Sequence, residues 1–273
     1  MYPGHVADVI ISVNKNLSYD PHRFFQLAES LGARHALIHV EDDSLGQVAH
    51  MVRLMRSSAY RSITIMIDSP DLIVSDDLLS EWVANDRVVH VVIVGQQNDS
   101  KKMIDYVPTE WFQRRHEPSP LNMVCSLDYY AETQTWNPSF HRRLFVSAVG
   151  SVHSGWCDPE AHARVEDVCD MGSLRRILFN QRFNTLSSAA KSRTDICMSC
   201  EFRHICVDGR APIMRGKIEW YHTTECAYNP YICKWKGEEG YRTLAECGVV
   251  SNADGFSIDH ERIAAINAEL WGE

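Results

Sequence analysis

The chain has 273 residues, of which 45% are hydrophobic and 23% charged, a composition typical of folded rather than disordered or fibrous proteins. Its 27 Lys and Arg against 36 Asp and Glu give a formal net charge of −9, which argues against a nucleic-acid partner because such binding needs a basic face. No apolar run reaches the roughly 18 residues of a membrane span, and the first residues lack the basic and apolar parts of a signal peptide. We therefore expect a cytoplasmic protein that binds neither membranes nor nucleic acid.

The first 95 residues alternate β-branched apolar runs with amphipathic helical segments. Strands are expected at residues 8–13, 35–40, 62–67 and 88–94. Helices are expected from Asp20-Pro21 to Gly32, around residues 48–55 and around residues 78–83. This alternation is typical of right-handed βαβ units on a parallel sheet, and four strands are too few for an eight-stranded barrel. The expected fold class is therefore α/β, with a partial (β/α) barrel or an open parallel sheet.

The remainder of the chain has a different pattern. Residues 96–141 are polar and interrupted by prolines, which predicts a long irregular connection. A hairpin is expected around Gly150, a helix at residues 173–183 and a terminal helix at residues 260–270. We therefore expect two domains, a partial βα-repeat domain over residues 1–140 and a small cysteine-rich domain with a C-terminal helix over residues 141–273.

Nine cysteines are unusual for a chain expected in a reducing compartment, where clustered thiols bind metal more often than they form disulfides. The spacing Cys197-x2-Cys200-x5-Cys206, followed by Cys226, can supply four thiolates to one ion or cluster. Cys233 is the alternative fourth ligand. Thiolate suits zinc and iron–sulfur clusters alike, so the residue types leave the identity of the metal open.

The segment from Cys197 to Arg210, Cys-Met-Ser-Cys-Glu-Phe-Arg-His-Ile-Cys-Val-Asp-Gly-Arg, resembles the SPASM domain of radical S-adenosylmethionine peptide maturases, in particular the type encoded beside ATP-grasp peptide ligases. The similarity extends over about residues 140–236. It includes Glu201-Phe202-Arg203, the run Cys226-Ala-Tyr-Asn-Pro-Tyr231 followed by Trp235, and the upstream hairpin. The resemblance implies that Cys197, Cys200, Cys206 and Cys226 hold an auxiliary [4Fe–4S] cluster, and that the preceding βα units correspond to part of the family's barrel.

Two departures from this family limit what the resemblance implies. Many SPASM domains hold a second auxiliary cluster with a cysteine four positions after the third ligand, or three positions after it in the related type; these positions are Arg210 and Gly209 here. The N-terminal CxxxCxxC motif, which holds the cluster that cleaves S-adenosylmethionine, is absent, since no cysteine precedes Cys125. We therefore expect one [4Fe–4S] cluster, no S-adenosylmethionine and no autonomous radical chemistry.

These features together predict an iron–sulfur, SPASM-like protein that acts as a peptide-binding or accessory subunit in the maturation of a ribosomally synthesised peptide. Its expected partners are the precursor peptide, a partner maturation enzyme, or both. Two alternatives stay open: a peptide-modifying or electron-transfer enzyme that uses the cluster, and a protein-interaction module stapled by zinc. No catalytic residue is assigned.

Overall fold

The computed structural model describes residues 6–96, 103–114, 117–120 and 123–272. The chain divides into two compact units, and each contains two separate stretches of sequence. Unit 1 comprises Met1–Arg114 and Arg142–Asn184, and unit 2 comprises Arg115–His141 and Thr185–Glu273. This division differs from the boundary expected after residue 140, because the strands that follow this position hydrogen-bond to the first sheet.

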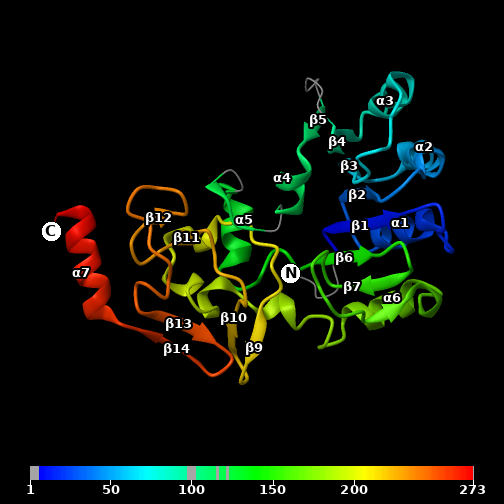
Figure 1. Cartoon of the computed structure of the whole chain (residues 1–273). Coiled ribbons are helices and arrows are strands. Elements are labelled where there is room, and N and C mark those ends of the chain that lie inside the picture. Colours follow the sequence, from blue (N-terminus) through cyan, green and yellow to red (C-terminus); the bar gives the residue numbers. More distant parts are fainter. Residues whose placement is uncertain (1–5, 97–102, 115–116, 121–122, 273) are drawn as a thin grey trace. The chain divides into compact units, whose positions relative to one another are not determined.

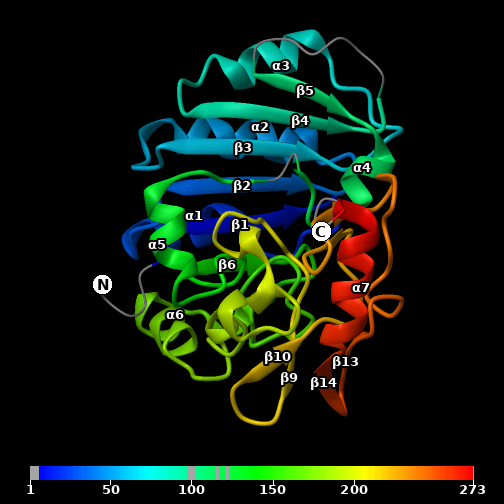
Figure 2. The same cartoon turned by 90° about the vertical axis from the view of Figure 1, so that its left-hand side faces the viewer.

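Unit 1 contains one eight-stranded sheet. Its strands are β1 (Asp8–Val13), β2 (His35–Val40), β3 (Ser62–Ile67), β4 (Val88–Val94), β5 (Ile104–Val107), β6 (Arg143–Val146), β7 (Ser151–His153) and β8 (Ala163–Arg164). Its helices are α1 (Pro21–Ser30), α2 (Leu45–Leu54), α3 (Asp76–Val83), α4 (Thr109–Gln113) and α6 (Met171–Leu178). The strand order is β5-β4-β3-β2-β1-β6-β7-β8, and the strands from β5 to β6 are parallel, as Figure 2 shows. The expected α/β class, with an open and mostly parallel sheet, is confirmed.

Helices α1, α2 and α3 lie on one face of this sheet (Figure 1). Successive right-handed crossovers that all proceed in one direction along a sheet place their helices on the same side. The sheet residues on that side are fully buried and apolar, among them Ile11, Ile38 and Ile65. They form the main core with Phe25 of α1 and Trp82 of α3.

Most expected elements recur close to their predicted positions, but the helix expected at residues 173–183 is α6, which begins at Met171 and ends at Leu178. Helix α1 begins as its sequence indicates, because the Asp20 side chain accepts a hydrogen bond from the backbone N–H of His22 and Pro21 opens the first turn. The expected hairpin is formed by β6 and β7 around Gly150, whose φ of +79° favours glycine. The prediction of an irregular connection over residues 96–141 is wrong in part, since β5, α4 and α5 (Leu127–Thr133) lie there. These elements are four to seven residues long, too short to give a clear periodic pattern.

Unit 2 has short elements. Besides α5 it contains three two-stranded hairpins and the terminal helix: β9 (Ile213–Arg215), β10 (Glu219–Tyr221), β11 (Tyr228–Asn229), β12 (Lys234–Trp235), β13 (Val249–Asn252), β14 (Gly255–Ile258) and α7 (His260–Trp271). Three 3₁₀ turns, Lys191–Arg193, Cys197–Ser199 and Glu201–His204, lie in and just before the segment from Cys197 to Cys206. Across the described part of the chain, no helix is long and apolar enough to cross a membrane.

The core of unit 1 predicts a large cost for an internal cavity. Replacing the fully buried Ile38 by alanine is expected to lower the free energy of unfolding by about 2–5 kcal/mol, measured by urea unfolding followed by circular dichroism. The control is Ile73→Ala, at a side chain that is 86% exposed, which should change the stability by no more than about 0.5 kcal/mol. Equal effects of the two substitutions would contradict this assignment of the core.

Candidate metal centre

Cys197 and Cys200 are presented by one tight turn. The backbone N–H of Cys200 donates to the Cys197 carbonyl at 3.0 Å, which closes the 3₁₀ turn. Ile196, just before it, has a φ of +68°, a conformation that β-branched residues rarely adopt. Asp195 anchors the turn, because its buried carboxylate accepts two hydrogen bonds from the Arg215 guanidinium, at 2.7 and 3.1 Å, and one from Ser251 Oγ at 2.7 Å. Strained backbone of this kind is characteristic of functional sites.

The segment that carries Cys206 is supported by α5, which comes from the stretch expected to be an irregular connection. Tyr129 Oη donates to the Cys206 carbonyl at 3.0 Å, and Thr133 Oγ1 donates to the His204 carbonyl at 3.2 Å. The N–H of Val124, next to α5, donates to the Ile205 carbonyl at 2.8 Å. Residues 124–133 therefore help to position the third cysteine.

The structure brings Cys197, Cys200, Cys206 and Cys226 together, since each thiol is close enough to others of the set to influence their ionisation. Burial raises the pKa of Cys200 and that of Cys206 to about 12, and it also raises the pKa of Cys197 and of Cys226. Without a metal ion these side chains are therefore neutral thiols at pH 7. Metal coordination removes the thiol proton, as thiolate ligation requires.

Two of the four sulfur atoms accept backbone hydrogen bonds from residues two positions further along. The N–H of Tyr228 lies 3.4 Å from Cys226 Sγ, and the N–H of Phe202 bonds to the Cys200 sulfur. Each bond opposes the effect of burial by lowering the pKa of its thiol. The backbone therefore favours thiolate at both positions.

Cys233, the alternative fourth ligand, lies in a different environment. Its side chain is exposed, and its sulfur lies 3.9 Å from the carbonyl oxygen of Pro230 and near the Tyr228 hydroxyl. Cys233 is not among the groups with the largest effects on the pKa values of the other four cysteines. The geometry thus groups Cys226, rather than Cys233, with Cys197, Cys200 and Cys206.

Three buried charged side chains adjoin the thiols. Lys191 Nζ lies 3.0 Å from Asp208 Oδ2, and the Arg210 guanidinium binds both oxygens of the same carboxylate at 2.9 Å. The side chains of Lys191, Asp208 and Arg210 are 6%, 1% and 11% exposed. Both cations act on the thiols, since Lys191 affects the pKa of Cys197 and Cys206, and Arg210 affects that of Cys197 and Cys226. One carboxylate for two buried cations leaves a surplus of positive charge beside four thiols.

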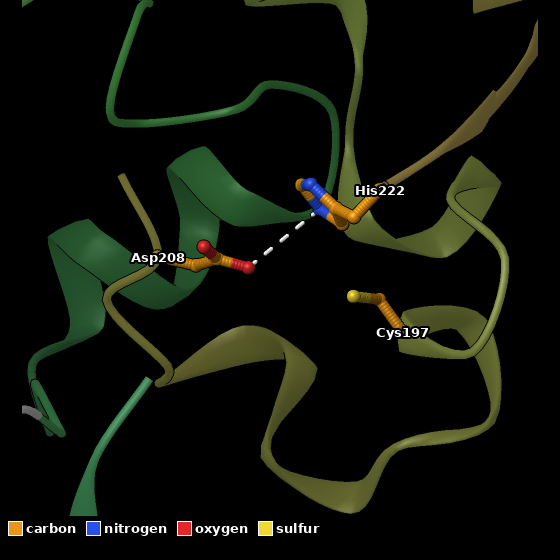
Figure 3. Close-up of side chains that lie close together, drawn as sticks. All are labelled: Cys197, Asp208 and His222. Atoms are coloured by element: carbon orange, nitrogen blue, oxygen red, sulfur yellow. Dashed lines mark ion pairs between the residues drawn. The ribbon is translucent and has the colours of Figure 1, made fainter. Parts of the chain in front are cut away.

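His222 completes the cluster, and Figure 3 shows it with Cys197 and Asp208. One potential ligand atom from each of these residues lies within 4.8 Å of the others, a spacing that could hold a metal ion. Burial lowers the pKa of His222 to about 4, so the imidazole is neutral at pH 7. Its Nδ1 is buried and has no hydrogen-bond partner in the described residues. Asp208 is a poor cation ligand, because Lys191 and Arg210 already occupy its oxygens.

The flanking residues that carried the sequence resemblance converge in space. The rings of Phe202, Tyr228 and Trp235 contact one another, with centroid distances of 5.0, 4.8 and 6.2 Å. The Tyr228 hydroxyl bonds to the Glu201 carboxylate. These aromatic side chains stabilise the turns that hold Cys200 and Cys226.

A cavity of about 260 Å³ opens beside the thiols. Cys197, Cys226, Arg210 and His222 line one part of it, and apolar residues, including Leu244, Val249 and Val250, line another. Two of its charged lining groups also bond to the backbone: Arg210 donates to the Thr224 carbonyl at 2.7 Å, and Glu225 accepts from the Leu244 N–H. The cavity therefore offers charged, polar and apolar groups to a ligand.

The comparisons with known proteins supply little beyond this geometry. No protein-family model matches the chain, and no curated protein does. Among solved structures, the chain is similar to the crystal structure of selenomethionine BtrN in an open conformation, with 12% identity and a TM-score of 0.44. That similarity covers 72% of this chain and 92% of the other.

Proposed function

We propose that this protein holds one [4Fe–4S] cluster on Cys197, Cys200, Cys206 and Cys226, and that it serves as a peptide-binding or accessory subunit in maturation of a ribosomally made peptide. The observation that carries the proposal is the convergence of four thiols, one buried and three half-buried, on a site with excess buried positive charge. Unbalanced buried charge is costly. Four thiolates around a metal centre supply the missing negative charge.

The positions of the sulfur atoms are compatible with a cluster, and they do not form the compact group that one zinc ion requires. Zinc–sulfur bonds of about 2.3 Å in a tetrahedron place the ligand sulfurs about 3.8 Å apart. In the described residues, which include all nine cysteines, no three cysteine sulfurs lie within 4.8 Å of one another. A cube of iron and sulfide separates its ligand sulfurs more widely, so the absence of three sulfurs this close is compatible with a cluster. When bound, such a cluster supplies one-electron chemistry.

Metal analysis tests this part of the proposal. The protein is purified without oxygen, its visible spectrum is recorded, and iron, sulfide and zinc are counted per chain. We expect a brown protein with about four irons and four sulfides. A colourless protein with one zinc would reject the cluster and favour the zinc-stapled interaction module.

The peptide-binding role is supported by the cavity beside Cys197 and Cys226, which is large enough for one or two amino-acid side chains. Val250 lines the cavity and is 48% exposed, so an approaching chain can reach it. We expect that peptides selected from a displayed random library on the metal-loaded protein bind at least tenfold more weakly to Val250→Arg, a loss of about 1.4 kcal/mol.

The matched control is Val149→Arg, at a residue of unit 1 that is 65% exposed. This variant should bind the selected peptides as the wild type does, in a fluorescence anisotropy titration. Equal binding by all three proteins would show that the cavity is not the peptide site.

A further inference from the structure

Lys191 and Arg210, the two cations beside the thiols, both bond to the buried carboxylate of Asp208. The buried Lys191 ammonium has three N–H donors, and its one hydrogen-bond partner among the described residues is Asp208. Arg210 uses its Nε and Nη2 on Asp208 and its Nη1 on the Thr224 carbonyl. A single carboxylate thus fixes both cations in place.

This arrangement lies directly against the proposed ligands. A carboxylate oxygen of Asp208 lies within 4.8 Å of Cys197 Sγ, and Arg210 lines the same cavity as Cys197 and Cys226 (Figure 3 shows Cys197 and Asp208). All three charged side chains are largely buried, so solvent screens them weakly. Each charge would therefore act on a metal centre at these cysteines with little screening by solvent.

We propose that Lys191 and Arg210 are positioning residues that raise the reduction potential of the cluster, and that Asp208 limits this effect while holding both cations in place. The inference rests on the proposed function. In the reduction, the oxidised cluster accepts one electron from an external one-electron reductant such as dithionite, and no covalent bond is made or broken. The reduced cluster is more negative by one charge, so neighbouring cations stabilise it relative to the oxidised form. Net charge near a cluster is one of the factors that set its potential.

The test is a redox titration with dithionite, followed by electron paramagnetic resonance and visible absorption, on the metal-loaded full chain. Lys191→Met should lower the midpoint potential by at least about 59 mV, which corresponds to a tenfold change in a one-electron equilibrium. Arg210→Gln should lower it as well. Asp208→Asn, which removes the negative charge, should raise the midpoint potential. The double variant Lys191→Met/Asp208→Asn should lie closer to the wild type than either single variant.

The opposite signs distinguish an electrostatic role from structural damage, since damage to the site would not raise the potential in one variant and lower it in another. Lys217→Met is the matched control, because this lysine is exposed in the β9–β10 turn, where solvent screens its charge. Unchanged potentials, or shifts of one sign in all variants, would overturn the inference while leaving the cluster in place. A wild-type protein without iron would overturn the proposed function and the inference together. Should Lys191→Met fail to fold, Arg210→Gln and Asp208→Asn still provide the two signs.

Discussion

Cys200→Ala is expected to release the metal from the protein. Cys200 shares a tight turn with Cys197, and its sulfur accepts the Phe202 N–H, so no neighbouring cysteine can replace it without rebuilding the turn. Losing an outer partner of a metal ligand already costs about 10–100-fold in affinity, and losing a ligand should cost at least as much. Iron, sulfide and zinc counts on protein purified without oxygen measure the effect. Stoichiometric metal in this variant would refute the assignment of Cys200.

Cys233→Ala is the matched control, because the same atoms are removed from an exposed side chain seven positions after Cys226. It should retain the wild-type metal content, whereas Cys226→Ala should lose it. The reverse result would show that Cys233 is the fourth ligand. The comparison therefore decides an alternative that the cysteine spacing leaves open.

The sheet of unit 1 could be predicted in detail because its strands are buried. The strands at residues 8–13, 35–40, 62–67 and 88–94 have the predicted bounds, since runs of β-branched residues between helices have few other ways to be buried. Strand β5 escaped prediction because Ile104–Val107 is only four residues long and follows a polar stretch. Each unit combines two separate stretches of the sequence. This could not be predicted, because pairing between strands far apart in the chain leaves no local sequence signal.

The candidate site shows the same limit. The cysteine spacing identifies the four thiols, because each is positioned by the turn or loop in which it lies. The sequence does not indicate that Lys191, Asp208 and His222 belong to the site, since their proximity depends on the tertiary fold. Asp208 lies within the quoted motif, between Cys206 and Arg210, and this placement was the one available signal. For Lys191 the signal was weaker: a lysine after Ala189 and Ala190 looks like an ordinary surface residue, yet it is 5% exposed.

Removal of the metal is expected to unfold unit 2 locally and leave unit 1 intact. Unit 2 has a small apolar core, in which Ile232, Cys247 and Val249 are the fully buried members, and its strands are two to four residues long. Such a small core needs a staple. Once the metal is gone, the thiols regain their protons, because their pKa values are raised. The Asp208 carboxylate is then the one negative charge beside Lys191 and Arg210, and their surplus positive charge is no longer compensated by thiolates.

Hydrogen exchange followed by mass spectrometry, with and without prior metal removal by a chelator, measures this effect. Residues 191–206 and 226–235 should exchange much faster after metal removal, because local opening then exposes their backbone amides. Strands β1 and β2 are the internal control and should exchange at the same rate in both samples. Their residues Ile11 and Ile38 lie in the apolar core of unit 1, which contains none of the proposed metal ligands. Unchanged protection of residues 191–206 would mean that the turns are stable without metal. The four thiols would then be a binding site on a preformed scaffold, and the metal would act in the chemistry of the protein rather than in its folding.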